Sequence, residues 1–275
     1  MTATPTGLRG DYLEVAGLRL YYERSDEFTA GGPPLLLLHG GLLNIDLSFA
    51  GLLAALVSGR GVIALELQGH GRSSDGDRPF TVSTLASDVT ALLDELGLEQ
   101  VDILGFSLGG LVATEFAVEH PGRVRRLILA STHFRGDGYH AEINDPGLHA
   151  TSTRMPSEAD FAAMQQSYAE LAPDPDHFAE FLAKASAAVG SFDGWSDEAI
   201  AGLPGPTLLV VGDHDFVRLE HSVDFRRTCA EANLRCCRRL RTCRSWTGSR
   251  FWFRCLNGSS TNRMGVRLFT DVMLS

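Results

Sequence analysis

The sequence predicts an α/β fold: a doubly wound, mostly parallel sheet with an inserted helical cap. Continuous apolar runs alternate with helical patterns along most of the 275 residues, as is typical of strands that are buried on both faces and joined by helices. A glycine-rich turn around Ser107 joins one such run to a helical pattern. One long segment without an evident strand interrupts the alternation, and we interpret it as the cap.

The strands of the parallel sheet are expected at the continuous apolar runs. These runs are residues 35–38, 61–67, 101–104, 126–131 and 207–211. Ahead of them, alternating polar and apolar residues on both sides of Gly17 predict an antiparallel hairpin of edge strands with one wet face. Helical patterns cover about 48–57, 84–96, 108–119 and 218–230, and Gly97 and Pro121 supply stop signals.

The segment 133–203 shows helical patterns at 157–171 and 177–189 and no evident strand. We therefore expect three parts in the chain. Residues 1–132 and 204–234 form the core, residues 133–203 form a helical cap inserted after the sixth strand, and residues 235–275 form an atypical basic tail rich in cysteine and arginine.

The turn Gly105-Phe106-Ser107-Leu108-Gly109 has the pattern of a nucleophile elbow. In such a turn the serine adopts unfavourable backbone angles, so that only small residues fit two positions before and after it. The hydroxyl group is then exposed beyond the carboxyl end of the sheet, where doubly wound folds bind their ligands. The alternative interpretation is a glycine-rich turn that carries an ordinary hydroxyl group.

Several motifs agree with this interpretation and occur in a consistent order. Leu38-His39-Gly40-Gly41 resembles an oxyanion loop, and residues 67–73 resemble the loop after the next strand, although Glu66 stands where Asp is usual. Gly212-Asp213-His214-Asp215 resembles an acid motif. On these motifs, residues 10 to about 230 resemble the α/β-hydrolase superfamily, in the branch of cap-bearing serine hydrolases that includes esterases, lactonases and carbon–carbon bond hydrolases.

The resemblance implies a role for each matching residue. Ser107 would be the nucleophile and Asp215 the acid, with Asp213 as the second choice. The alternative for either aspartate is a turn or helix-cap residue. The backbone N–H groups of Gly41 and Leu108 would form the oxyanion hole, and His39, Gly40, Phe106 and His133 would bind substrate. The resemblance implies neither a metal nor an organic cofactor.

The histidine that should follow the acid is missing from the sequence. A serine hydroxyl group is a weak nucleophile unless a base accepts its proton, and in this family the order is Ser, acid, His. The last histidine, His221, lies only six residues after Asp215 and inside a predicted helix, and residues 222–275 contain none. His39 and His133 are the alternative candidates for the base.

The composition changes near residue 235. Residues 1–234 hold 15 basic and 33 acidic side chains, whereas residues 235–275 hold nine basic and one acidic. All five cysteines, at positions 229, 236, 237, 243 and 255, lie at or after Cys229. Arg, Cys, Trp and Ser are the residues that GC-rich coding DNA yields when it is translated out of frame. Lys184 is the only lysine in the sequence, which also indicates GC-rich coding DNA. The resemblance implies a last strand and a closing helix in this region, but neither periodicity fits well, so both elements are doubtful. We hypothesise a frameshift near residue 234, with a hidden histidine codon spanning Arg241 and Thr242.

Three other interpretations of residues 235–275 are open. Clustered cysteines bind zinc in some proteins, although adjacent Cys236 and Cys237 lack the paired short spacing of a zinc finger. Nine arginines with interleaved aromatic residues could bind nucleic acid by pairing with phosphates and stacking on bases. A solvated, poorly ordered tail is the third.

We predict a serine hydrolase that cleaves an ester, a lactone or a carbon–carbon bond of a small molecule through an acyl-Ser107 intermediate, impaired here by the missing histidine. The alternatives are a non-catalytic ligand-binding homologue and a cofactor-free perhydrolase. We expect no nucleic-acid or membrane partner. The N-terminus lacks a basic region followed by an apolar stretch, which favours a cytoplasmic protein.

Overall fold

The computed structural model describes residues 8–26, 28–29, 32–57 and 60–241. The strands within these ranges are β1 (Arg9–Val15), β2 (Leu18–Arg24), β3 (Leu35–Leu38), β4 (Val62–Leu65), β5 (Val101–Phe106), β6 (Val124–Ala130), β7 (Thr207–His214) and β8 (Ala232–Arg241). The helices are α1 (Ile45–Leu56), α2 (Val82–Glu95), α3 (Leu108–Glu119), α4 (Ala141–Asn144), α5 (Glu158–Leu171), α6 (Phe178–Gly190), α7 (Asp197–Ala201) and α8 (Leu219–Thr228). Short 3-10 turns occupy Pro121–Arg123, Gly136–Gly138, Pro146–Thr151 and Pro175–His177.

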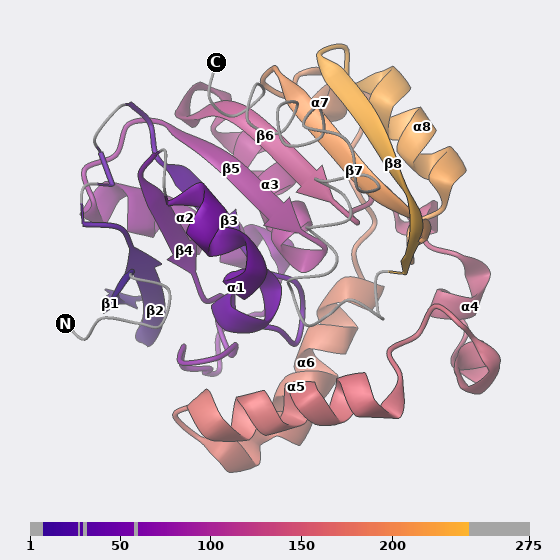
Figure 1. Ribbon diagram of the computed structural model, residues 1–275, viewed down its shortest axis with the longest axis horizontal. Coiled ribbons are helices and arrows are strands. Elements are labelled where there is room, and N and C mark those ends of the chain that lie inside the picture. The colour runs from indigo at the N-terminus through magenta and orange to yellow at the C-terminus, as the bar shows by residue number, and fades with distance from the viewer. Residues whose placement is uncertain (1–7, 27, 30–31, 58–59, 242–275) are drawn as a thin grey trace.

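The described strands form one sheet in the order β1-β2-β4-β3-β5-β6-β7-β8 (Figure 1). All neighbours from β4 to β8 are parallel, whereas β1 and β2 pair antiparallel with each other and β2 pairs antiparallel with β4. The predicted mostly parallel, doubly wound sheet is therefore confirmed. One detail differs: β1 is an edge strand as expected, but β2 is interior, because its second side pairs with β4.

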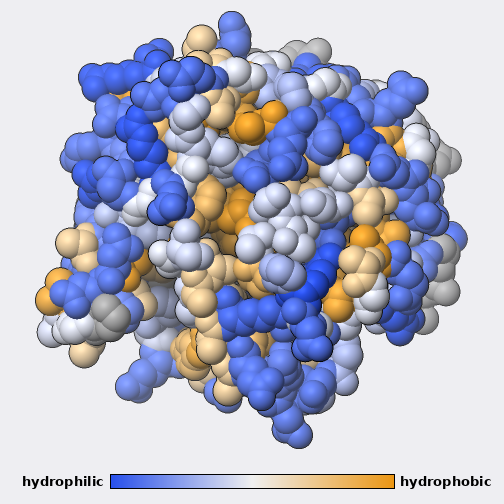
Figure 2. Space-filling view, turned by 180° about the vertical axis from the view of Figure 1, so that it is seen from behind, coloured by the Kyte–Doolittle hydropathy of each residue, from blue (hydrophilic) through white to orange (hydrophobic). Residues whose placement is uncertain are grey.

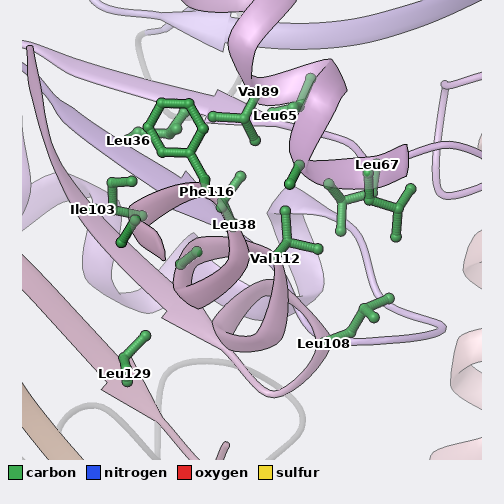
Figure 3. Packing of buried hydrophobic residues seen from close by; sticks show 14 of the residues in the cluster. Leu36, Leu38, Leu65, Leu67, Val89, Ile103, Leu108, Val112, Phe116 and Leu129 are labelled. Carbon is green, nitrogen blue, oxygen red and sulfur yellow. The ribbon is translucent and has the colours of Figure 1, made fainter. Parts of the chain in front are cut away.

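Helices cover both faces of the sheet, and the alternation of side chains along each strand divides the core into two clusters. On one face, Leu35 and Leu37 of β3 belong to the cluster that contains the apolar residues of α1. On the other, Leu36 and Leu38 pack with α2, α3 and α8. Figure 3 shows this second cluster around Phe116 of α3. Strands that are buried on both faces explain the continuous apolar runs in the sequence.

The strand that the unusual composition after residue 234 left in doubt is present. β8 runs parallel to β7, with Leu209 opposite Leu234 and Val211 opposite Cys236. It therefore crosses residue 235, where we expected the atypical tail to begin. The closing helix expected after this strand, and the rest of the tail, lie outside the described residues.

Helices α4 to α7 lie between β6 and β7 in the chain, and α5 and α6 lie together beyond one end of the sheet (Figure 1). The expected helices at 157–171 and 177–189 correspond to α5 and α6, and the described residues between 133 and 203 contain no strand of the sheet. The face opposite to that of Figure 1 is largely hydrophilic, with hydrophobic side chains gathered in a hollow near its middle (Figure 2). Among the described helices, none has the length and apolar character that crossing a bilayer requires.

Candidate active site

Ser107 occupies the sharp turn between β5 and α3 that the sequence predicts. Its φ of 50° and ψ of −114° lie in a region that residues with a side chain rarely adopt. A Cβ on Gly105 would lie 2.4 Å from the carbonyl oxygen of Gly109, and one on Gly109 would lie 2.1 Å from that of Leu38. These contacts explain why the residues two positions before and after Ser107 are both glycine.

The backbone around Ser107 is held by hydrogen bonds from the neighbouring strand and helix. Its N–H group donates to the carbonyl oxygen of Ala130 on β6 at 2.8 Å. Its carbonyl oxygen accepts from the N–H group of Gly110 at 2.8 Å and from Oγ1 of Thr132 at 3.2 Å. The strained turn is therefore fixed by tertiary contacts, and Ser107 itself remains partly exposed.

The loop after β3 approaches the start of α3. The N–H group of Gly109 donates to the carbonyl oxygen of His39 at 3.0 Å, and a Cβ on Gly41 would lie 3.7 Å from Cβ of Leu108. Among the described residues, no acceptor is found for the N–H groups of Gly41 and Leu108. Two neighbouring N–H groups without acceptors, next to a strained serine, can stabilise a developing oxyanion.

His39 has a structural place in this loop. It is fully buried, and its Nδ1 lies 2.8 Å from the carbonyl oxygen of Gly40, while Nε2 accepts from the N–H group of Leu67 at 3.0 Å. Burial and then the neighbouring His70 hold the pKa of His39 well below its usual range. Both ring nitrogens are occupied within the protein, so the side chain is not placed to bind substrate or to act as the base, which differs from both expectations.

Phe106 packs against the same loop. A Cβ on Gly40 would lie 2.9 Å from Cδ1 of Phe106, so the close approach of ring and backbone requires glycine at position 40. Only 6% of Phe106 is exposed. These two expected substrate-binding residues are therefore in contact with each other beside the Ser107 turn.

Asp215 directly follows β7 and is almost completely buried, whereas Asp213 is exposed. The Asp215 carboxylate accepts hydrogen bonds from Oγ of Ser131 at 2.6 Å and from the N–H groups of Gly212 at 3.1 Å and Val217 at 3.2 Å. Of the two aspartates, Asp215 is therefore the buried one whose carboxylate is held in place by hydrogen bonds, at the same end of the sheet as Ser107.

Ser131 is a residue that the sequence reasoning missed. It follows the end of β6 with a positive φ of 52°, and it joins the β6 end to Asp215 through its hydroxyl group. The strand pattern contains no signal for this role, because a serine after a strand is common in loops. The contact spans 84 positions in sequence, so only the folded chain reveals it.

His133 and His221 lie close to each other, on either side of Gly138. The His133 ring packs against Tyr139 and Phe192, with ring centroids 4.2 and 5.7 Å away. Nε2 of His221 accepts from the N–H group of Phe134 at 3.2 Å. Burial lowers the pKa of each of these histidines to about 4. Nδ1 of His133 is buried without a hydrogen-bond partner, and the role of His133 in substrate binding stays a prediction.

The loop after β4 contains a buried ion pair at the position where the family pattern has Asp. Glu66 is fully buried and accepts from the N–H group of Arg72 at 2.6 Å and from its Nη1 at 2.7 Å. Burial raises the pKa of Glu66 to about 7, although Arg72 opposes this shift. A Cβ on Gly71 would lie 2.4 Å from the carboxylate, so Glu66 fills the centre of the loop. The longer side chain is thus accommodated by the glycine beside it.

All nine histidines of the sequence lie in the described part of the chain. His39, His133 and His221 have the contacts given above. No cluster of three or more potential metal ligands occurs among the described residues. The zinc interpretation of the cysteines rests partly on positions 243 and 255, which lie outside the described residues.

The fold belongs to a known class of proteins. A sequence profile of the family described as alpha/beta hydrolase fold matches residues 33–176, just over half of the chain. The chain belongs to this α/β-hydrolase family. The matched residues include the loop after β3, the loop after β4 and the Ser107 turn.

Individual relatives match a shorter part of this chain than the family profile does. An uncharacterised protein of Mycobacterium bovis is 39% identical over 110 residues, which are 40% of this chain and 32% of that protein. A pimeloyl-[acyl-carrier protein] methyl ester esterase of Aeromonas hydrophila is 39% identical over 102 residues, 37% of this chain and 38% of the esterase. The chain thus matches about a third of the length of these relatives. The solved structure of Est816, an N-acyl homoserine lactone degrading enzyme, superposes with a TM-score of 0.70 and 21% identity over 91% of this chain and 100% of that one, which shows a common fold.

Proposed function

We propose that this chain is a serine hydrolase scaffold for small ester-like substrates, with Ser107 as the nucleophile. The observation that carries the proposal is the strained turn at Ser107, which lies beside two N–H groups without described acceptors. Strain is retained in a fold where the surrounding structure and the function require it. The Aeromonas relative is a methyl ester esterase and Est816 degrades a lactone, and both names support an ester-like bond as the one that this chain cleaves.

In the proposed reaction, Oγ of Ser107 attacks the carbonyl carbon of the substrate and its proton passes to a base. The N–H groups of Gly41 and Leu108 donate to the oxyanion, and each such donor contributes about 3 kcal/mol in related sites. The bond to the leaving alcohol then breaks as the base returns the proton to it. Water hydrolyses the acyl ester on Ser107 through the same steps, and Asp215 orients the base.

The base is the part of this machinery that the sequence lacks. Removing the histidine of such a triad lowers the rate by several powers of ten. We propose that the histidine is encoded in the alternative reading frame after Leu234. The second candidate function, a ligand-binding protein without catalysis, is favoured by the internal hydrogen bonds of His39 and His221.

Hydrolysis of short p-nitrophenyl esters tests the proposal with three proteins. These are the chain as given, its Ser107→Ala variant, and a version in which the region after Leu234 is restored to the alternative frame. We expect Ser107-dependent hydrolysis in the restored protein at a rate at least about 10³-fold above that of the chain as given. Reaction with a fluorophosphonate probe should follow the same order, because it needs an activated Ser107.

Two outcomes would contradict the proposal in different ways. If the restored protein hydrolyses no ester and does not react with the probe, the scaffold is not a serine hydrolase and the ligand-binding function is favoured. If the chain as given shows full Ser107-dependent activity, a different base operates and the frameshift hypothesis is wrong.

A further inference from the structure

A pocket of about 420 Å³ lies between the cap and the core. One wall is formed by residues 73–77, in the loop after β4, and the other by Tyr168 of α5 and by residues between 173 and 184. Neither Ser107 nor Asp215 is among the described residues that line it. The space is open in the structure as it stands and has the size of a site for a small organic molecule.

Tyr168 brings to this pocket a hydroxyl group that the fold leaves unused. Only 7% of Tyr168 is exposed, and its ring packs against Phe178 and Phe181 with ring centroids 5.1 and 5.5 Å away. Among the described residues, the hydroxyl group has no hydrogen-bond partner, and it is accessible to solvent. The ring is thus fixed by packing, while the polar end of the side chain is available to a ligand.

Two carboxylates indicate which way this hydroxyl group faces. Burial, and then the charges of Asp75 and Asp174, raise the pKa of Tyr168 to about 12. Both carboxylates line the pocket. The hydroxyl group therefore lies on the pocket side of the ring. It keeps its proton at neutral pH and can both donate and accept a hydrogen bond.

The charged side chains of the pocket are mostly acidic. Apart from His177, they are Asp75, Asp77, Asp174, Glu180 and Lys184. The lining is therefore negative whether or not His177 is protonated. Lys184 donates to Asp75 at 2.7 Å and neutralises that carboxylate, and Glu180 lies 3.1 Å from Nδ1 of His177. Asp77, Asp174 and Glu180 are exposed, so a positively charged molecule is attracted to the pocket.

The residues of the pocket favour an organic cation over a metal ion. No group of three or more potential metal ligands occurs in the part of the chain that the structure describes. An ammonium group has three N–H donors and no acceptor, so it matches a lining of carboxylates and a hydroxyl group. Pro173 and the Tyr168 ring offer apolar contact to the carbon chain that carries the ammonium group.

We propose that this pocket binds a short aliphatic amine. Its ammonium group is held by Oη of Tyr168 and the carboxylate of Asp174, while Asp77 and Glu180 add attraction from the two walls. The pocket is not lined by Ser107 or Asp215, so this inference goes beyond the proposed function and does not depend on it.

Calorimetry with 1,5-diaminopentane and 1,5-pentanediol tests the proposal on the chain as given, at pH 8 and physiological salt. We expect the diamine to bind, and the diol, which has the same length and no charge, not to bind measurably. Tyr168→Phe keeps the ring and removes only the hydroxyl group, and Asp174→Asn removes one charge. Each substitution should weaken binding of the diamine about fivefold.

Tyr12→Phe and Asp224→Asn are the matched controls, because both residues are exposed and neither lines the pocket. They should leave the affinity for the diamine unchanged. The proposal is overturned if the diamine does not bind or if the diol binds as tightly. It is also overturned if the pocket variants and the controls bind the diamine equally, because the attraction would then come from the net negative charge of the protein.

NMR on the unsubstituted chain keeps the test decisive if the Tyr168→Phe protein does not fold. The backbone amide resonance of Gly76, in the pocket wall, should move when the diamine is added, and that of Gly122, outside the pocket, should not. An unchanged Gly76 resonance would contradict the proposal. Neither measurement involves ester hydrolysis, so the failure of this proposal and the failure of the proposed function are separate outcomes.

Discussion

Gly109 shows how single residues of the Ser107 turn depend on partners that are distant in sequence. Its N–H group donates to His39, and its Cα faces the backbone of Leu38 at the end of β3. Similarly, Ser131 supplies the hydroxyl group that donates to Asp215. At the residue scale, the site is therefore a set of close backbone approaches between strand ends.

We predict that Gly109→Ala destabilises the protein by about 2 kcal/mol or more. Alanine is the better helix former by about 1 kcal/mol, but the added Cβ would lie 2.1 Å from a backbone oxygen that cannot easily move. Urea unfolding at pH 7 measures the difference. Gly122→Ala is the control, because its Cβ meets nothing within 4 Å, and it should change stability by less than about 0.5 kcal/mol. Equal stability of the two variants would contradict the prediction.

Among the contacts between elements, one carboxylate connects α6 to the loop after β4. Asp75, in the loop after β4, accepts from Nζ of Lys184 on α6 at 2.7 Å, and it lies 3.0 Å from Nε2 of His177. Gln68 donates to it at 2.7 Å. Burial opposes ionisation, but the hydrogen bonds from Lys184, Gln68 and His177 lower the pKa of Asp75 to about 2. The anion is therefore present throughout the neutral range and ties α6 to the core.

Lys184→Met should loosen α6 without unfolding the core. The pair is partly buried, so its loss should cost about 1 kcal/mol and raise amide hydrogen exchange in α6 roughly fivefold. The exchange rates are read by mass spectrometry or NMR. Arg227→Met breaks the exposed pair with Asp224 on α8 and should leave exchange in α6 unchanged. Unaltered exchange in the Lys184 variant would show that Asp75 does not hold the cap.

For the whole molecule, the response of stability to acid follows from buried histidines. The folded-state pKa values of His39, His70, His133 and His221 all lie below the usual 6.5. As the pH falls below 6.5, the unfolded chain takes up protons that the folded chain does not, so stability decreases until the folded-state pKa near 4 is reached. Glu66 has the opposite effect on stability. Its pKa is 4.5 in the unfolded chain and about 7 in the folded one, so between these pH values the folded chain binds the extra proton and stability increases as the pH falls.

We therefore predict that the free energy of unfolding is lower at pH 5 than at pH 7, by roughly 3 kcal/mol, because four histidines outweigh one glutamate. Urea titrations at the two pH values measure it. His133→Phe should reduce the difference by about 1 to 2 kcal/mol, since one of the contributing groups is removed. A stability that rises on acidification would mean that Glu66 dominates.

The parallel strands and the turn at Ser107 could be predicted before the fold was known, because a short stretch of sequence marks each of them. Strands such as residues 35–38 are continuous apolar runs since both of their faces are buried, and the turn is marked by the glycines two positions before and after Ser107. The sequence also shows that residues 222–275 contain no histidine. It did not reveal that β2 is interior, since strand order depends on the pairing of β2 with β4, about 40 positions away.

The environment of each candidate side chain could not be predicted and is known from the folded chain alone. The fold buries Asp215 and exposes Asp213, occupies both nitrogens of His39, and turns His133 toward Tyr139. It also leaves Nε2 of His70 unpartnered. The physical reason is common to all of them: burial and hydrogen bonding at these positions are set by groups that the fold brings together from distant parts of the chain, and a local sequence pattern contains no record of those groups.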